Sequence, residues 1–283
     1  MPFEKKTVRL ANGLTMPYLE QGDPDGVPVI LIHGYSDSSL SFEPVLEYLP
    51  SNVRALAVTL RGHGDADRPP SGYALSDFAN DVALFAEALE LGPAVVVGHS
   101  MGSGVARDFA IEHPSRTSAV VLIGAFAKMH GNTVIDELEQ AVRQLSDPVD
   151  PVFVREFQEG TITHPVPPEF VDRAVAESLK MPARVWNAVL DGMLAYDLED
   201  RLENITVPVL AVWGDRDAIF GQDDWDSLAA SLPNVRIELY PGAGHATHWE
   251  HPDRFASDLV AFIEYGAGGA NLAELLVDRM NAC

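Results

Sequence analysis

Cysteine is nearly absent from this chain of 283 residues, whose only cysteine is Cys283. A single cysteine excludes any disulfide within the chain, so nothing in the sequence requires an oxidising compartment. Long hydrophobic runs are lacking too. The first residues have no apolar stretch of the signal-peptide kind, and no run approaches the length that spans a membrane. We therefore expect a cytoplasmic protein that does not bind membranes.

Positive charge is also scarce. The chain has 19 lysine and arginine residues against 42 aspartate and glutamate residues, which gives a formal net charge of −23. Such an excess repels phosphate backbones and anionic lipid surfaces, and it argues against nucleic acid as a partner. The fraction of hydrophobic residues, 47%, is ordinary for a globular protein and excludes general disorder.

Short apolar runs rich in β-branched residues alternate with segments of helical periodicity. The runs occupy Val27–Ile32, Val53–Val58, Val95–Val97, Ala119–Ile123, Val207–Trp213 and Val235–Tyr240. Runs that are apolar on both faces are typical of strands buried between helices. We therefore predict an α/β fold with a mostly parallel central sheet and helices on both of its faces.

The alternation stops between Met129 and Asn204. This stretch has no β-branched runs and contains helical patterns joined by proline-rich segments, at Val134–Leu145, Pro168–Leu179 and Pro182–Leu194. We predict a core built from residues 1–128 and 205–265, with residues 129–204 inserted as a helical cap over the edge of the sheet.

Residues 266–283 follow as a C-terminal tail, in which Gly266, Gly268 and Gly269 form a hinge before a short predicted helix. Leu272, Leu275, Leu276 and Met280 would share one face of that helix. Two interpretations stay open for this apolar face: it docks on its own domain, or it forms the contact of a homodimer.

One apolar run ends abruptly in Gly98-His99-Ser100-Met101-Gly102, and a helix-compatible segment follows. A strand that turns into a helix within a residue or two needs small residues on both sides of the turn, because a Cβ there would crowd the neighbouring chain. Such a turn lifts the hydroxyl of Ser100 off the end of the strand. The motif in this context predicts a nucleophilic serine.

A serine hydroxyl reacts only when a base takes its proton, and that base is usually a histidine held by a carboxylate. Asp217 lies just past a predicted buried strand, and His245 follows the glycine-rich turn after the last strand. The chain order Ser100, Asp217, His245 is the one expected for an α/β-hydrolase. Asp215, two residues earlier, competes with Asp217 for the acid role.

Several motifs together make the chain resemble the α/β-hydrolase superfamily, in its cap-bearing esterase, lactonase and peroxidase-like branch. They are His33-Gly34, Arg61-Gly62-His63-Gly64, Gly98–Gly102, Gly214-Asp215-Arg216-Asp217, Gly244-His245 and Trp249-Glu250-His251-Pro252. The resemblance extends from about Thr7 to Ile263. It implies Ser100 as nucleophile, Asp217 as acid and His245 as base, with the helical cap inserted before the strand that carries the acid.

The same resemblance assigns finer roles. The family pattern places the carboxylate three positions after the glycine, which favours Asp217 over Asp215. It also implies that the backbone N–H groups of Met101 and Tyr35 form the oxyanion hole. Two positions depart from the usual pattern, Ser103 in place of a glycine and Ala66 in place of a serine, and they leave the finer subfamily open.

Other site residues are predicted less directly. Bulky apolar side chains of the cap and of the strand ends are candidates to line the substrate pocket: Phe126, Met129, Phe153, Phe157, Met181, Trp186, Met193, Leu194, Ile219 and Phe220. His245, His248 and His251 have a regular spacing, but the Gly-Ala-Gly turn before them and Pro252 after them make a single ligand-bearing helix improbable. We predict neither a metal nor a cofactor. His33 and His63 are expected to brace their loops through hydrogen bonds.

The residues favour a hydrolase that cleaves a small to medium, largely apolar carboxylic ester or lactone through an acyl-enzyme on Ser100. Two other activities use the same three residues: a cofactor-free perhydrolase or haloperoxidase, and a carbon–carbon bond hydrolase. A small-molecule receptor with residual hydrolase activity is the alternative outside the enzyme class. The sequence alone does not distinguish among these four.

Overall fold

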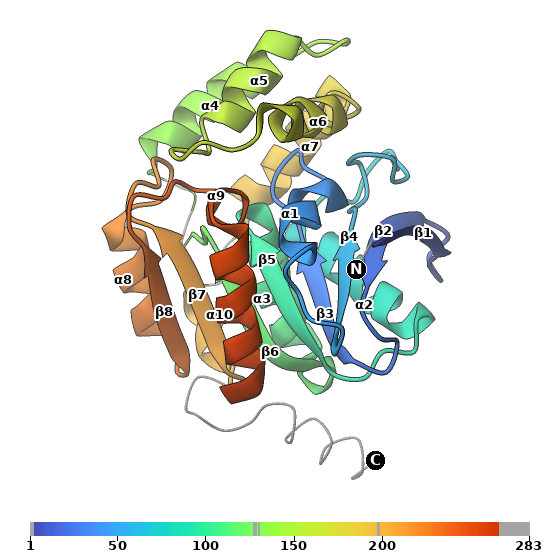
Figure 1. The fold of residues 1–283 in the computed structure, drawn as a ribbon. Coiled ribbons are helices and arrows are strands. Elements are labelled where there is room, and N and C mark those ends of the chain that lie inside the picture. Colours follow the sequence, from blue (N-terminus) through green and yellow to red (C-terminus); the bar gives the residue numbers. More distant parts are fainter. Residues whose placement is uncertain (1–2, 127–128, 130, 197–198, 266–283) are drawn as a thin grey trace.

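The computed structural model describes residues 3–126, 129, 131–196 and 199–265. Its centre is an eight-stranded sheet with the strand order β1-β2-β4-β3-β5-β6-β7-β8 (Figure 1). The strands are β1 (Glu4–Arg9), β2 (Thr15–Gln21), β3 (Val27–Ile32), β4 (Val53–Val58), β5 (Ala94–His99), β6 (Thr117–Ile123), β7 (Val209–Gly214) and β8 (Val235–Tyr240). The predicted C-terminal helix, with its two interpretations, lies outside the described residues.

Among the described strands of this sheet, β2 alone runs against the others. β1 pairs with β2 in an antiparallel hairpin, and β2 pairs antiparallel with β4. From β4 to β8 every neighbouring pair is parallel. The predicted fold class, an α/β protein with a mostly parallel sheet, is therefore confirmed.

Side chains alternate along each strand, so the sheet has two buried faces. In β3, Ile30 and Ile32 join a core that includes Phe78, whereas Val29 and Leu31 join a second core on the other face. All four side chains are fully buried. A strand covered on both sides needs a continuous apolar run, which is why these segments are recognisable in the sequence.

Helices cover each face of the sheet. The core that contains Ile30 includes residues of α2 (Leu75–Ala88), α3 (Met101–Glu112) and α8 (Gln222–Ser231). The core that contains Val29 includes residues of α1 (Glu43–Leu46) and α10 (Pro252–Tyr265). Short helical turns complete the layers at η1 (Ser39–Phe42), η2 (Pro114–Arg116), η3 (Glu199–Asn204) and α9 (Thr247–Glu250).

Four helices lie together above one end of the sheet (Figure 1), and we call them the helical cover. They are α4 (Thr133–Arg143), α5 (Pro151–Glu159), α6 (Pro168–Ser178) and α7 (Ala183–Leu194). The side-chain oxygen of Asn132 accepts hydrogen bonds at the start of α4, and that of Asp150 does the same at the start of α5. Helix α5 was not among the helices predicted from the sequence.

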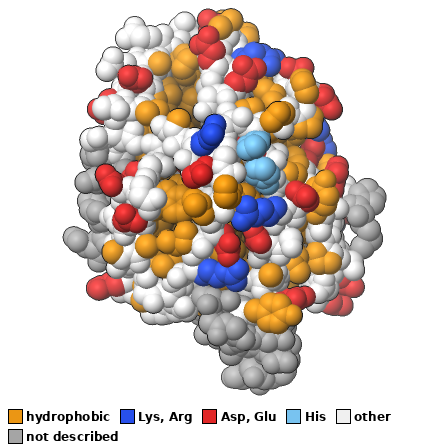
Figure 2. All heavy atoms as spheres, turned by 60° about the vertical axis from the view of Figure 1, so that its left-hand side comes forward, with side chains coloured by type: hydrophobic (Ala, Val, Ile, Leu, Met, Phe, Trp, Pro, Cys, Tyr) orange, Lys and Arg blue, Asp and Glu red, His pale blue; other side chains and the backbone are white. Residues whose placement is uncertain are grey.

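One side of the surface exposes the edge strand β8. On the face in Figure 2, acidic side chains are dispersed among hydrophobic and basic ones. Ile237 and Leu239 of β8 are 42% and 47% exposed. Among the residues placed by the structure, no helix has both the length and the hydropathy to cross a bilayer.

Candidate active site

The backbone between β5 and α3 adopts a strained conformation at Ser100. Its φ of +52° and ψ of −116° lie outside the regions that residues with a side chain normally adopt. The amide of Ser100 donates to the carbonyl of Ile123 at 2.9 Å, and the hydroxyl of Ser103 donates to the carbonyl of Ser100 at 2.6 Å. The turn is thus held by β6 on one side and by α3 on the other, and strain held in this way is typical of functional sites.

Glycine is required on both sides of this turn. A Cβ on Gly98 would lie 2.0 Å from the carbonyl oxygen of Gly102. A Cβ on Gly102 would lie 2.4 Å from the carbonyl oxygen of Ile32. Both contacts are with backbone atoms, which cannot move aside as a flexible side chain can. The close approach of β3, β5 and α3 therefore accounts for the Gly-x-Ser-x-Gly pattern.

A buried hydrogen bond joins two of the predicted residues. Nδ1 of His245 lies 2.8 Å from Oδ2 of Asp217, and both side chains are almost completely buried. Oδ1 of Asp217 accepts hydrogen bonds from the amides of Ile219 and Phe220, at 2.8 and 3.2 Å. Because a carboxylate only accepts, Nδ1 of His245 carries the proton of this bond. Nε2 is the nitrogen left to take a proton.

The structure separates Asp217 from its competitor. Asp215 accepts a hydrogen bond from the amide of Gly242, in the turn after β8, and has no contact with His245 in the described part of the chain. Its carboxylate therefore braces a turn. Nε2 of His245 has no hydrogen-bond partner among the described residues, and His245 lines the same cavity as Ser100.

Two backbone amides lie where the sequence places the oxyanion hole. Met101 is the first residue of α3, and Tyr35 follows Gly34 at the end of β3. No backbone carbonyl of the described residues accepts a hydrogen bond from either amide. The hydroxyl of Tyr35 points elsewhere, donating to the carbonyl of Trp186 in α7 at 2.6 Å.

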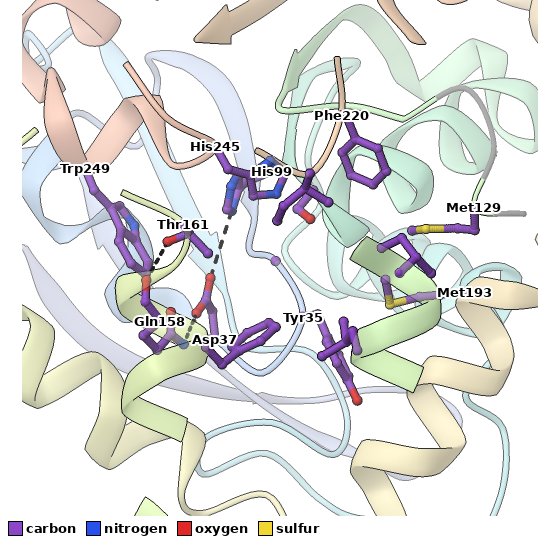
Figure 3. A pocket seen from close by; sticks show the side chains of 16 residues that line it. Tyr35, Asp37, His99, Met129, Gln158, Thr161, Met193, Phe220, His245 and Trp249 are labelled. Atoms are coloured by element: carbon purple, nitrogen blue, oxygen red, sulfur yellow. Dashed lines mark hydrogen bonds and ion pairs between the residues drawn. The ribbon is translucent and has the colours of Figure 1, made fainter. Parts of the chain in front are cut away.

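A cavity of about 40 Å³ lies between the strand ends and the helical cover (Figure 3). That volume has room for only a few water-sized atoms. The sheet side contributes Gly34, Tyr35, Asp37, His99, Ser100, Ile219, Phe220, His245 and Trp249, and the segment from 129 to 193 contributes Met129, Ile135, Leu138, Phe157, Gln158, Thr161 and Met193.

Five of the ten predicted pocket residues line this cavity: Met129, Phe157, Met193, Ile219 and Phe220. The other five lie elsewhere. Phe126 packs against Phe220 and Arg107, and Met181 and Trp186 are completely buried inside the cover. Phe153 contacts the rings of Phe157 and Trp186, and Leu194 packs on the core at the end of α7. These side chains support the wall without lining it, because an apolar helical position serves a core as well as a pocket.

Three polar residues of the cavity, Asp37, Gln158 and Thr161, were not predicted. Asp37 follows the His33-Gly34 motif by only three residues, so its closeness to a recognised loop is the signal that could have indicated it. Gln158 lies in α5, which was not among the predicted helices, and Thr161 lies in the turn that follows it. The remaining unpredicted lining residues are Gly34, Ile135, Leu138, His99 and Trp249.

Asp37 is a buried carboxyl group in the wall of the cavity. Its Oδ1 accepts a hydrogen bond from Nε2 of Gln158 at 2.8 Å, and its Oδ2 lies 3.9 Å from Nδ1 of His99. Burial raises the pKa of Asp37 to about 7, although Gln158, the charge of His245, the Gly34 amide and the Ser41 hydroxyl act in the opposite direction. The group therefore titrates near neutral pH.

The other buried histidines are kept neutral. Burial places the pKa of His33 and that of His99 well below their usual value, lowers the pKa of His63 to about 4 and lowers that of His248 to about 3. His33 bonds to the carbonyl of Gly34 and accepts from the amide of Leu60. His63 bonds to the carbonyl of Arg61. The prediction that His33 and His63 brace their loops is confirmed.

One group of possible metal ligands lies away from the cavity. His164, Glu250 and His251 have ligand atoms within 4.8 Å of one another. Both oxygens of Glu250, however, already accept hydrogen bonds, from the amides of Thr163, His164 and Gly244. The carboxylate thus fastens the segment after α5 to the loop that carries His245, and that role explains its position.

The fold and the arrangement of Ser100, Asp217 and His245 define a hydrolase of the α/β type. A family model described as the alpha/beta hydrolase fold matches residues 27–252, and the chain belongs to this family.

The proteins that this chain resembles carry the names of different enzymes. A non-heme chloroperoxidase from Streptomyces lividans is 29% identical over 277 residues, which cover 91% of this chain and 99% of the relative. A 2-(acetamidomethylene)succinate hydrolase from Mesorhizobium japonicum is 27% identical, with coverages of 89% and 92%. Among solved structures, an esterase from Rhodococcus sp. ECU1013 superposes with a TM-score of 0.80 at 27% identity, covering 93% of this chain and 98% of that one.

Proposed function

We propose that this protein hydrolyses small carboxylic esters, including lactones, through an acyl-enzyme on Ser100. The observation that carries the proposal is that Ser100 and His245 line one cavity, while Asp217 binds His245 from behind the wall; the three follow the ends of β5, β7 and β8. A strained serine, an imidazole with a free Nε2 and a carboxylate that fixes the imidazole are the groups that acyl transfer requires.

Acylation begins when the hydroxyl of Ser100 attacks the ester carbonyl and Nε2 of His245 takes the proton. Asp217 stabilises the imidazolium that forms and keeps the ring in one tautomer. Negative charge collects on the carbonyl oxygen, where the amides of Met101 and Tyr35 donate hydrogen bonds. His245 then gives its proton to the departing alcohol as the C–O bond breaks.

Deacylation repeats these steps with water as the nucleophile. His245 takes a proton from water, the hydroxide adds to the acyl carbon, and the tetrahedral intermediate again rests on the two amides. Collapse of this intermediate returns the proton to Oγ of Ser100 and releases the acid. The ester and one water molecule balance the two halves of the reaction, and Ser100 and His245 return to their starting state.

The size of the cavity indicates which esters react fastest. About 40 Å³ between Phe157, Met193 and Phe220 accommodates an acyl group of a few carbon atoms. A longer chain would have to displace side chains that are packed on both sides. We therefore expect acetyl and butyryl esters to be better substrates than octanoyl esters.

The test is hydrolysis of 4-nitrophenyl acetate, butyrate and octanoate by the native protein and by Ser100→Ala. The native protein should show the highest kcat/KM with the two short esters, and Ser100→Ala should lose on the order of 10⁴-fold or more. Unchanged thermal unfolding of the variant would show that the fold is intact. Hydrolysis that persists undiminished in Ser100→Ala would overturn the proposal. A single turnover followed by a retained acyl product would favour a receptor over an enzyme.

A second activity is supported by one specific observation, the 29% identity with a non-heme chloroperoxidase over nearly the whole chain. Hydrogen peroxide in place of water would attack the same acyl-enzyme and release a peracid, which oxidises halide in solution. Bromination of monochlorodimedone in acetate buffer with peroxide measures this reaction. Bromination that requires both acetate and Ser100 is the expected result, and bromination by Ser100→Ala would exclude this route.

A further inference from the structure

The cavity has a polar side and an apolar side. Figure 3 shows Asp37, Gln158 and Thr161 on one side, with Met129 and Met193 across the cavity. Asp37 is 5% exposed and Gln158 is 1% exposed, so these polar groups are buried in the wall of a cavity whose lining is otherwise mainly hydrophobic. Buried polar groups are normally paired completely, and an unpaired one next to a cavity indicates a ligand.

His99 supplies a ring without a side-chain partner. Its side chain is 3% exposed and lines the cavity; no side chain of the described residues hydrogen-bonds to either ring nitrogen, and the polar group that approaches the ring is the backbone of His245. The rings of His245 and His248 lie beside it, with centroids 4.9 and 4.5 Å away. One nitrogen of each neighbour is bonded elsewhere, to Asp217 for His245 and to Ser41 for His248, and the second nitrogen of each has no partner among the described residues.

The distance between Asp37 and His99 fits a bridging atom. Oδ2 of Asp37 and Nδ1 of His99 are 3.9 Å apart, which is too long for a direct hydrogen bond. One oxygen atom placed between them and to one side would lie about 2.8 Å from both. Gly34 packs against one side of this pair, since a Cβ there would lie 2.9 Å from Nδ1 of His99 and 3.3 Å from Oδ2 of Asp37, so the bridging atom lies on the side away from Gly34.

We propose that Asp37 and His99 form a subsite that binds a hydroxyl group of the ester substrate, next to Ser100. The inference rests on the proposed ester hydrolysis and specifies its substrate class: short hydroxylated esters. The hydroxyl group occupies the polar side of the cavity, and the apolar remainder of the substrate lies against Met129 and Met193.

A hydroxyl group suits this pair better than a charged group does. It donates to the Asp37 carboxylate while it accepts from an Nδ1–H of His99, and the two bonds reverse direction when Asp37 is protonated. A carboxylate on the substrate would lie against the Asp37 carboxylate. An ammonium group would satisfy Asp37 but has no lone pair to offer His99.

The experiment compares ethyl butyrate with ethyl 2-hydroxybutyrate, ethyl 3-hydroxybutyrate and 2-hydroxyethyl butyrate, with release of acid followed by pH-stat. For each variant, the selectivity is kcat/KM for the best hydroxylated ester divided by kcat/KM for ethyl butyrate. The native protein should prefer one hydroxylated ester. Asp37→Leu should lower the selectivity about 10-fold or more, the loss expected for a buried hydrogen bond to an ionisable group. Asp37→Asn retains an acceptor and a donor and should keep most of the selectivity.

The matched control is Leu138→Met, a conservative change of another lining residue. It should alter both kinds of ester by the same factor and leave the selectivity unchanged. An equal loss on all esters in Asp37→Leu would overturn the subsite, since Asp37 would then act on the chemical step or on water. A preference for ethyl 3-aminobutyrate over the hydroxylated esters would also overturn it.

Binding separates this inference from the proposed function. If ethyl butyrate is not hydrolysed at all, ester hydrolysis as proposed is wrong, and the subsite is tested on Ser100→Ala by titration with the same esters. Trp249 lines the cavity, so its fluorescence reports occupancy. Tighter binding of a hydroxylated ester than of ethyl butyrate, lost in Ser100→Ala/Asp37→Leu, supports the subsite. Equal binding of both esters by Ser100→Ala contradicts it.

Discussion

The cavity lies between two regions that are held in different ways. On one side, the ends of the parallel strands place Ser100, Asp217 and His245 through backbone hydrogen bonds and through glycines that admit no Cβ. On the other side, the helical cover is attached by side chains that reach across long stretches of sequence, such as Tyr35 to Trp186 and Gln158 to Asp37.

The two kinds of attachment indicate a division of roles. Groups fixed by the backbone hold a constant geometry, which acyl transfer requires of its nucleophile, base and oxyanion donors. Groups joined by long-range side-chain contacts can be exchanged without disturbing the sheet, so they suit the choice of substrate. If the division holds, changes at the strand ends should abolish turnover with little effect on stability. Changes where the cover meets the strand ends should alter stability or selectivity and leave turnover intact.

The largest effect is expected from Asp217→Asn. The asparagine keeps its oxygen on the two backbone amides that Asp217 binds and turns its NH2 group toward His245, so the imidazolium loses its carboxylate partner and kcat for 4-nitrophenyl butyrate should fall on the order of 10⁴-fold. The matched control is Asp215→Asn, two residues earlier. Its side chain still accepts from the amide of Gly242, and kcat should stay within about threefold. A large loss in Asp215→Asn together with a small one in Asp217→Asn would assign the acid role to Asp215.

The second-largest effect is expected on the free energy of unfolding, which should depend on pH through the buried carboxyl group of Asp37. Its pKa is about 7 in the folded protein, against 3.8 for an unperturbed aspartate, so the folded state binds the proton more tightly. The stabilisation by this proton is complete below about pH 4 and is lost as the pH rises through 7. Above pH 7 the buried charge therefore costs up to roughly 4 kcal/mol of unfolding free energy.

Thermal unfolding at pH 8 and pH 5 checks this expectation. Asp37→Asn should unfold several degrees above the native protein at pH 8, and the gain should shrink at pH 5. Protonation of His33, His63 and His248 at low pH destabilises the native protein and the variant alike. This effect therefore cancels in the difference between their unfolding midpoints. Asp172→Asn, at an exposed carboxylate of α6 paired with Arg155, should show no such pH-dependent gain. A gain for Asp37→Asn that is the same at both pH values would contradict the assignment.

The sheet and its site could be predicted because their determinants are local. Buried strands are continuous apolar runs, and the turn at Ser100 needs glycine at positions 98 and 102 for contacts that lie within the adjoining elements. Asp217 and His245 follow directly after strands, and the ends of parallel strands meet at one edge. The residues therefore come together once the order of the strands is right.

The polar side of the cavity could not be predicted because its residues meet only in the folded chain. Asp37 and Gln158 are separated by 121 positions. Gln158 belongs to α5, whose short amphipathic pattern between prolines resembles a loop, and Thr161 follows that helix. Trp186 has the size of a pocket residue, yet it faces the interior of the cover. Hydrophobic periodicity identifies the apolar face of a helix and leaves undecided whether that face lines a core or a cavity.

The smallest effect is expected where the two regions are joined by one neutral hydrogen bond. Tyr35→Phe removes the hydroxyl that donates to the carbonyl of Trp186 and leaves the backbone amide of Tyr35 in place. The loss should cost about 1 kcal/mol of unfolding free energy, which is about 2–4 °C in the midpoint for a protein of this size. Because the amide proposed as an oxyanion donor is retained, kcat for 4-nitrophenyl butyrate should stay within about threefold, and KM should rise as the cover loosens. A fall in kcat comparable to that of Asp217→Asn would mean that this side chain belongs to the catalytic group, and the division between the strand ends and the cover would no longer hold.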